Sequence, residues 1–250
     1  MVKSVVFSDF DGTITCEDSN DYIADRYGMG KEKRLEIFKS IIAGTGSFAV
    51  GFREMLESID KPFDECVQIL HDNITLDPGF TKTFQYCEKN DIPLIIISSG
   101  MKPIIRSLLG KLIGEEKANK IPIMSNDVKI DPKDNSKWEI VYKDTTPHGH
   151  DKSISINECK SEFDKKYPNE KITYFYCGDG VSDLSAAKEC DLLFAKKGKD
   201  LVTFCERDHV PYHEFETWED ILKAMKDVLE NGVGVGALMQ NKWSATNFWM

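Results

Sequence analysis

Residues 4–13 read SVVFSDFDGT, an apolar run that leads directly into two aspartates. The run has the character of a buried strand, and side chains along a strand alternate between its two faces. We therefore expect Asp9 and Asp11 on one face at the strand end, with Phe10 turned back towards the core. Two carboxylates that close need a divalent cation, a shared proton or a set of donors. The stretch predicts Mg²⁺ binding and acid–base chemistry, although a plain strand followed by an Asp-Gly turn has the same letters.

The composition limits the classes of protein to which the chain can belong. Its 250 residues, 41% of them hydrophobic, suit one large domain or a core domain with an insertion. A formal net charge of −10 argues against nucleic acid or an anionic membrane surface as a partner. Seven scattered cysteines without a Cys-x-x-Cys pair indicate reduced thiols, and we find no signal-like or membrane-spanning run. These features favour a cytoplasmic protein.

The hydrophobic pattern changes along the chain. From residue 18 to 71, apolar residues recur at spacings of three and four, which predicts four helices and no strand. Beyond residue 90, predicted strands (93–97, 172–177, 192–195, 211–215) alternate with predicted helices (101–112, 152–166, 182–190, 199–206, 217–229), and residues 121–142 predict a β-hairpin excursion. The alternation predicts an α/β fold, a Rossmann-like parallel sheet with helices on both faces.

The same patterns predict the domain organisation. We expect the α/β core in residues 1–15 and 76–231, and an inserted all-helical cap in residues 16–75. Residues 232–250 form a C-terminal tail with several aromatic residues, whose role the sequence leaves open. It also leaves open the oligomeric state.

Polar side chains follow three of the predicted strands. In open α/β sheets, ligands bind at the carboxyl ends of the strands, so these groups are expected to converge. They are Asp9 and Asp11, then Ser98, Ser99 and Gly100, then Asp179 and Asp183.

Mg²⁺ prefers oxygen ligands, so we assign it Asp9, the carbonyl of Asp11, and Asp179. Asp183 would hold a metal-bound water or orient a neighbour, although an acid at a helix start is also common without such a role. The segment around Asp179 is no dinucleotide fingerprint, because Asp183 replaces its third glycine.

An anion pocket is predicted next to these carboxylates. The Ser98 hydroxyl, the amides of Ser99 and Gly100 and the start of the next helix could hold an anionic oxygen, although an ordinary strand-to-helix turn has the same residues. Lys152 is placed to supply a cation for a phosphoryl group, with Lys102 and Arg106 as alternatives.

Four segments, DFDGT, SSG, the lysine of GHDKS, and GDGVSD, resemble the haloacid dehalogenase superfamily of phosphohydrolases in order, spacing and context. The resemblance covers residues 2–195. The helical insertion resembles the cap of the phosphoserine-phosphatase-like branch, and the longer segments resemble fungal small phosphatases, including those that act on polyol phosphates.

The resemblance implies a role for each residue. Asp9 would attack phosphorus and form an aspartyl-phosphate. Asp11 would protonate the leaving oxygen and then deprotonate the attacking water. Ser98 and Lys152 would hold the phosphoryl oxygens, with Mg²⁺ as cofactor. Haloalkanoate dehalogenases of the superfamily lack the second aspartate, so its presence favours phosphate esters.

Substrate choice is expected to lie in the cap. Asp18 matches an acidic position of phosphoserine phosphatases, but their arginine position falls near Met55, with Arg53 two residues earlier. Acceptors within residues 17–21, such as Asn20, favour a hydroxyl-rich small metabolite, a polyol or sugar-alcohol phosphate. A helix capped by Ser19, with acids that favour its dipole, explains them equally.

Other readings of the same residues stay open. Within the enzyme class, the alternatives are a phosphoserine or a methionine-salvage ketose phosphate phosphatase. From another class, the alternative is a catalytically weak binding or regulatory protein. His148 and His150 either line the site or pack beside Lys152.

Overall fold

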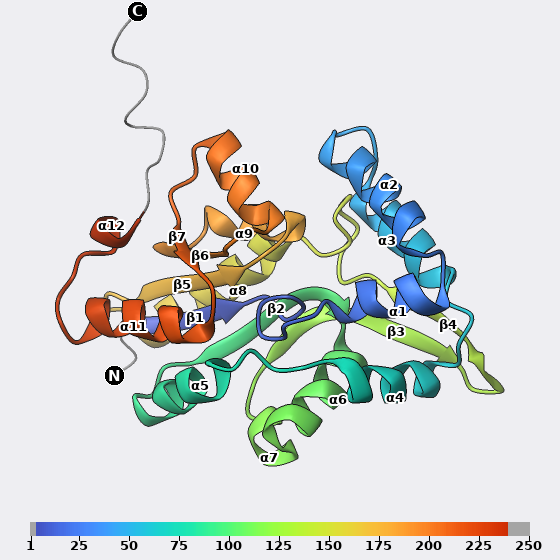
Figure 1. Cartoon of the computed structure of the whole chain (residues 1–250). Coiled ribbons are helices and arrows are strands. Elements are labelled where there is room, and N and C mark those ends of the chain that lie inside the picture. Colours follow the sequence, from blue (N-terminus) through green and yellow to red (C-terminus); the bar gives the residue numbers. More distant parts are fainter. Residues whose placement is uncertain (1–3, 240–250) are drawn as a thin grey trace, which may run out of the picture. The chain divides into compact units, whose positions relative to one another are not determined.

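The strands of the computed structural model form one mostly parallel sheet (Figure 1), as the sequence predicts. The structure describes residues 4–239. Within them the seven strands follow the order β4-β3-β2-β1-β5-β6-β7. Their bounds are β1 Ser4–Ser8, β2 Leu94–Met101, β3 Ile123–Asp131, β4 Asp134–Val141, β5 Thr173–Gly178, β6 Leu192–Lys196 and β7 His213–Phe215.

The chain divides into two compact units. The first unit comprises Met1–Asp9, Asp77–Ile95 and Lys152–Met250, and the second comprises Phe10–Leu76 and Ile96–Asp151. Strand β2 belongs to both, because its first two residues lie in the first unit and the rest in the second. The predicted division into core, cap and tail stays a prediction.

The first unit is built around β1, whose Val5, Val6 and Phe7 are completely buried. Strand β1 pairs in parallel with β5, from Ser4 opposite Thr173 onwards, and β5, β6 and β7 follow in parallel. A strand buried on both faces reads as a continuous apolar run, which is the pattern of residues 4–8.

The helices of the first unit follow the predicted alternation. They are α5 Phe80–Lys89, α8 Lys152–Lys166, α9 Leu184–Ala187, α10 Asp200–Asp208, α11 Trp218–Leu229 and α12 Val235–Leu238. Helix α5 lies beside α11 (Figure 1), where Phe80 and Trp218 meet edge to face with ring centroids 4.9 Å apart. The buried carboxylate of Asp77 accepts the Trp218 N–H at 2.9 Å and pairs with Lys196 at 3.0 Å, which ties α11 to β6.

The second unit contains the four helices predicted between residues 18 and 71. They are α1 Ser19–Tyr27, α2 Lys31–Ile42, α3 Phe48–Glu57 and α4 Phe63–Asn73, and α6 Lys102–Ile113 and α7 Glu115–Ala118 follow β2. The predicted hairpin is also present, since β3 and β4 pair antiparallel. Trp138 on β4 donates its indole N–H to the Lys61 carbonyl at 3.0 Å and meets Phe63 edge to face. The hairpin is thereby packed against the start of α4.

Three predicted element boundaries are wrong. The helix expected over residues 182–190 is a 3₁₀ turn at Val181–Asp183 followed by the single turn of α9. Two residues past α9, the Glu189 carbonyl accepts a hydrogen bond from Lys160 Nζ at 2.7 Å. Strand β2 continues to Met101 instead of ending before Ser98. Strand β7 begins at His213 rather than at Pro211, which lacks the N–H that a ladder needs.

Residues 240–250 of the predicted tail lie outside the described residues. Within residues 4–239, every helix is too short or too polar to cross a bilayer.

Candidate active site

The predicted site residues fall in both units. In the first unit, Lys152 is the centre of a buried charged cluster. It is the first residue of α8 and is completely buried, and its Nζ lies 2.9 Å from Asp9 Oδ2 and 2.6 Å from Asp183 Oδ1. Burial alone would lower the pKa of Lys152, but the carboxylates of Asp183 and Asp9 outweigh it and hold that pKa above its ordinary value. Lys152 is therefore a fixed cation beside Asp9.

Asp183 accepts a hydrogen bond from four donors. Its Oδ1 accepts from Lys152 Nζ and from the Tyr176 hydroxyl at 2.5 Å, and its Oδ2 accepts from the N–H groups of Asp179 and Gly180, both at 2.9 Å. Burial, and then the charge of Asp183, raise the pKa of Tyr176 well above its usual value, so this hydroxyl acts as a donor. A completely buried carboxylate with four donors positions its neighbours.

Close approach rather than backbone bending explains the glycine before Asp179. A Cβ on Gly178 would lie 2.6 Å from Asp183 Cγ, whereas a Cβ on Gly180 would meet nothing nearer than 4.0 Å. The role of Tyr176 escaped the sequence analysis. A tyrosine inside an apolar strand is the signal that could have revealed it, because a buried hydroxyl needs a partner.

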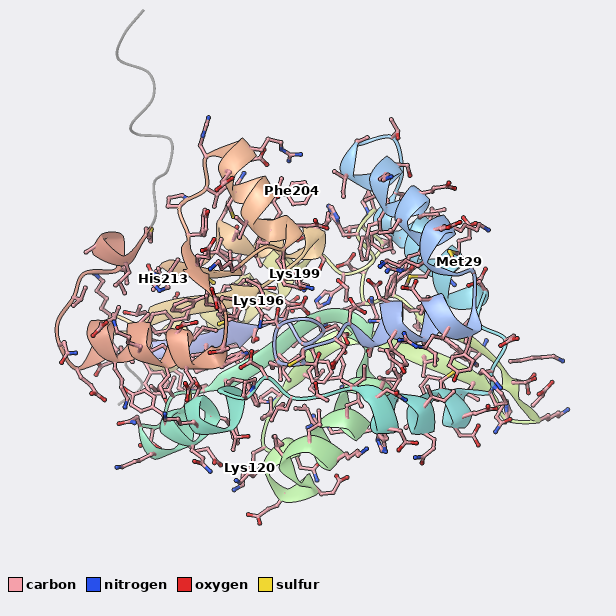
Figure 2. The ribbon with its side chains drawn as sticks, viewed as in Figure 1. Met29, Lys120, Lys196, Lys199, Phe204 and His213 are labelled. Carbon is pink, nitrogen blue, oxygen red and sulfur yellow. The ribbon has the colours of Figure 1, made fainter. Side chains whose placement is uncertain are left out.

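The same cluster fits a hard divalent cation. Carboxylate oxygens of Asp9, Asp179 and Asp183 all lie within 4.8 Å of one another. Oxygen-only sites suit such ions. Since four donors already occupy the oxygens of Asp183, Asp9 and Asp179 are the better candidates for direct ligands. The ammonium group of Lys199, labelled in Figure 2, lies 3.8 Å from Asp179 Oδ2 at the exposed side of the cluster.

In the second unit, the chain turns sharply after Phe10 instead of continuing β1. The Phe10 carbonyl accepts the N–H groups of Thr13, Ile14 and Thr15, at 3.3, 2.9 and 3.1 Å. Gly12 has φ +72°, a left-handed conformation that favours glycine. The strand alternation expected for Asp11 is therefore wrong: Asp11 belongs to the turn. Its buried position, 5% exposed, results from the turn.

The hydroxyl that ties this turn belongs to Thr15. Thr15 Oγ1 accepts from the Gly12 N–H at 3.2 Å and lies 2.7 Å from the Glu17 carbonyl, to which it donates. The Asp11 carboxylate is held in turn by the start of α1. Its Oδ1 accepts the Ser19 N–H at 2.8 Å, and its Oδ2 accepts the Asn20 side-chain amide at 3.0 Å. Neutral donors thus fix the orientation of Asp11.

Residues 98–100 lie in a bulge of β2. Ser98 pairs with Ser125 on β3, but the next pair joins Met101 to Asn126, so Ser99 and Gly100 are extra residues on one strand. The Gly100 N–H donates to Ser98 Oγ at 3.0 Å, so this amide is engaged within the bulge rather than open as the predicted pocket requires. Ser99 Oγ is buried and has no hydrogen-bond partner among the described residues.

The glycine of the bulge makes room for the acid of the turn. A Cβ on Gly100 would lie 2.9 Å from Asp11 Oδ2 and 3.3 Å from Ser98 Oγ. The second unit therefore brings Asp11, Asn20 and Ser98 together around a position that only glycine fits.

The cap residues proposed for substrate choice have different surroundings. Asp18 is the N-cap of α1 and accepts the N–H groups of Asn20 and Asp21, so the prediction of Ser19 as the cap is wrong. Met55 is completely buried. Arg53 is half-exposed, lies over the Tyr142 ring with 4.9 Å to its centroid, and lines a cavity of about 750 Å³ with residues of α3 and β4. Asn20 contacts Asp11.

Neither Arg106 nor Lys102, the alternatives to Lys152, is buried against a carboxylate as Lys152 is. The Arg106 guanidinium donates to the carbonyls of Ala118 and Ile121, and Lys102 is exposed at the start of α6. His148 is exposed, whereas His150 is buried with its Nδ1 2.7 Å from the Ser98 carbonyl oxygen. Of the two histidines, only His150 contacts a predicted site residue within the described residues.

Comparison with protein families gives a match over residues 6–188, to the model of haloacid dehalogenase-like hydrolases. The chain belongs to this family of haloacid dehalogenase-like hydrolases. Among curated family relatives, the polyol phosphate phosphatase PYP1 of Saccharomyces cerevisiae is 58% identical over 243 residues, which is 96% of this chain and 100% of the yeast protein. The Pdp3-interacting factor 1 of Schizosaccharomyces pombe is 46% identical over 221 residues, which is 88% of this chain and 94% of the S. pombe protein.

Solved structures agree with the family on the fold. A phosphoserine phosphatase with a phospho-aspartyl intermediate analogue has a TM-score of 0.64 and 19% sequence identity to this chain. The match covers 90% of this chain and 99% of the phosphoserine phosphatase chain. At that identity, the similarity concerns the fold of this hydrolase.

Proposed function

We propose that this hydrolase is a Mg²⁺-dependent phosphomonoesterase that forms an aspartyl-phosphate on Asp9 and acts on a polyol or sugar-alcohol phosphate. The observation that carries the proposal is the buried cluster in which the Lys152 ammonium lies 2.9 Å from the Asp9 carboxylate. A cation fixed beside a carboxylate suits a step that brings a negatively charged phosphoryl group to that carboxylate. The 58% identical yeast relative, a polyol phosphate phosphatase, supports the substrate class.

In the first step, an Asp9 oxygen attacks phosphorus and the bond from phosphorus to the ester oxygen breaks. Asp11, entering as the carboxylic acid, gives its proton to that oxygen, and the alcohol leaves. The Ser19 N–H and the Asn20 amide fix the direction in which Asp11 presents this proton. Lys152 and the Ser98 hydroxyl contribute positive charge and a donor for the phosphoryl oxygens.

In the second step, Asp11, now a carboxylate, takes a proton from water. The water oxygen bonds to phosphorus, the bond to Asp9 breaks, and inorganic phosphate leaves. Both aspartates return to their starting forms. Asp183 keeps Lys152 and the Asp179 loop in place through its four hydrogen bonds.

Asp9, the carbonyl of Asp11, and Asp179 would hold Mg²⁺. When bound, the ion neutralises charge on the phosphoryl group and orients it for in-line attack. Asp183 already accepts four hydrogen bonds, so it would position the metal ligands without binding the ion itself.

Several observations bear on the substrate and its compartment. Arg53 lies against Tyr142 and 3.9 Å from Glu57, so it is engaged by an aromatic ring and an acid rather than open to a substrate carboxylate. This favours a polyol over phosphoserine. We assign residues 16–75 the role of a cap that contributes Asp18 and Asn20. All seven cysteines are free, which supports a cytoplasmic location.

The test is phosphate release from a generic aryl phosphate, then from glycerol phosphates, pentitol and hexitol phosphates, phosphoserine and ketose phosphates. We expect turnover that chelation abolishes and Mg²⁺ restores, the highest kcat/KM on a polyol phosphate, and a loss of about a thousandfold or more in Asp9→Asn. Asp72→Asn is the matched control, since the side chain of this aspartate on α4 is 64% exposed.

Two outcomes would contradict the proposal. A wild type as inactive as Asp9→Asn on the whole panel would identify a binding protein on the same fold. A highest kcat/KM on phosphoserine would contradict the polyol preference alone.

A further inference from the structure

Two buried side chains reach the backbone carbonyls of Ser98 and Ser99 at the β2 bulge. The Asn126 amide donates to the Ser99 carbonyl at 2.7 Å, and His150 Nδ1 lies 2.7 Å from the Ser98 carbonyl. A carbonyl oxygen only accepts, so His150 Nδ1 carries the hydrogen. Asn126 and His150 are 0% and 1% exposed.

We propose that Asn126 and His150 are positioning residues, which hold the Ser98–Ser99 peptide so that the two serine hydroxyls can donate to a phosphoryl group. This role rests on the proposed function. Within the bulge, Ser98 Oγ already accepts the Gly100 N–H at 3.0 Å, so its hydrogen is left to donate elsewhere. Ser99 as a whole residue is 7% exposed, and its buried Oγ has no partner among the described residues. A buried hydroxyl without a partner is costly unless a ligand satisfies it.

Each positioning residue is itself anchored by the loop that follows β4. Asn126 Oδ1 accepts the Lys143 N–H at 2.9 Å, so both ends of this amide are used. Beyond His150, the Asp151 N–H donates to the Asp144 carboxylate at 2.7 Å, and Asp144 also accepts the Thr146 N–H at 2.9 Å. The loop 143–151 therefore fixes the two groups that fix the bulge.

A purely structural role would also satisfy these carbonyls, and it differs in what it predicts. If the two side chains only stabilise the fold, their replacement lowers stability without a selective effect on phosphate binding. If they position the serine hydroxyls, replacement weakens the binding of inorganic phosphate and lowers kcat in a protein that remains folded.

The His150 variants give the sharpest test, because two amides differ in which ring nitrogen they replace. The amide nitrogen of asparagine is attached to Cγ, as Nδ1 is, so His150→Asn keeps a donor for Ser98. The amide nitrogen of glutamine stands one bond further, at the place of Nε2, so His150→Gln loses that donor. Asn126→Asp keeps the acceptor for Lys143 and loses the donor to Ser99.

The measurements are the dissociation constant for inorganic phosphate with Mg²⁺ by calorimetry, kcat and KM on an aryl phosphate, and the unfolding midpoint. We expect His150→Gln and Asn126→Asp to weaken phosphate binding about tenfold and lower kcat about tenfold or more, as for one lost hydrogen bond to a charged ligand. His150→Asn should stay within about threefold of wild type. Ser125→Ala, which removes a bond to the Asn126 carbonyl on the same strand, is the control and should change neither constant.

Equal losses in His150→Asn and His150→Gln, or unchanged phosphate binding in folded His150→Gln, would overturn the positioning role. The histidine pair decides this even if Asn126→Asp does not fold. A wild type that neither hydrolyses the panel nor binds inorganic phosphate overturns the proposed function and this role with it. Unaffected variants of an active wild type overturn this role alone.

Discussion

The two units hold their aspartates by opposite means. In the first, Asp9 and Asp183 face the completely buried ammonium of Lys152, so a positive charge holds both carboxylates. In the second, Asp11 is held by a backbone N–H and by the neutral amide of Asn20. Removing one member of a buried ion pair leaves an uncompensated charge, whereas removing a neutral donor costs a single hydrogen bond. The comparison teaches that the first unit couples its stability to its chemistry and the second largely does not.

The largest expected effect is that of Lys152→Met. It leaves the buried carboxylates of Asp9 and Asp183 without their cation, so we expect the free energy of unfolding to fall by about 3–5 kcal/mol. Asn20→Ala in the second unit should cost about 1 kcal/mol. Urea denaturation measures both, with Lys82→Met, whose side chain is 67% exposed, as a surface control within about 0.5 kcal/mol. Equal costs for Lys152→Met and Asn20→Ala would break the comparison.

Gly178 in the first unit and Gly100 in the second each leave room for one of these aspartates. In Gly178→Ala the new Cβ would lie 2.6 Å from Asp183 Cγ, and in Gly100→Ala it would lie 2.9 Å from Asp11 Oδ2. Both should lower kcat/KM about tenfold or more, since each moves an aspartate of the site. We expect Gly178→Ala also to lose about 1–3 kcal/mol of stability, because the charged cluster must repack.

Gly180→Ala is the matched control for that pair. Its Cβ would meet only Asp183 Oδ2, at 4.0 Å, so stability and kcat/KM should stay close to wild type. Stability measured by urea denaturation separates the outcomes. A Gly178→Ala protein as stable as Gly180→Ala would show that the cluster tolerates displacement.

The last expected effect is a loss of stability at alkaline pH, to which each of several buried cysteines contributes a small part. Burial raises the pKa of Cys87 and Cys205 in the first unit, and of Cys66 in the second, from 9.0 to about 12. Above about pH 9 the unfolded thiols lose protons while the folded thiols keep them. The unfolded state then binds fewer protons, so stability falls as pH rises, on the order of 1 kcal/mol per pH unit for each thiol.

Urea denaturation in reducing buffer at pH 8 and pH 10 measures this loss. Replacing Cys87 and Cys205 by alanine should flatten the pH dependence more than replacing Cys66 alone, since the first unit holds two of these three thiols. A stability that rises from pH 8 to pH 10 would contradict the assignment.

The sequence predicts the sheet and the helices well, because long periodic patterns reflect burial directly. The run before Asp9 and the four helices between residues 18 and 71 are examples. The sequence also predicts the charged groups of the first unit, because Asp9, Lys152 and Asp179 stand at the ends of recognisable strands or helices.

What the sequence does not predict depends on register and on turn closure. The position of Asp11 follows from the turn on the Phe10 carbonyl, and local alternation cannot show where a strand stops. Asn126 matters because β2 carries two extra residues opposite it, and a shift of register depends on both strands at once. Tyr176 points to Asp183 only once both lie in one folded unit.

The pairing of Ser4 with Thr173 has a consequence for the synthesis of this chain. Strand β1 leaves the ribosome before its β5 partner, which follows about 170 residues later. At about 5–20 residues per second, the apolar side chains of β1 wait on the order of ten seconds or longer for that neighbour. During this interval the nascent chain carries an exposed strand edge, which makes it a natural client for chaperones that bind short apolar segments.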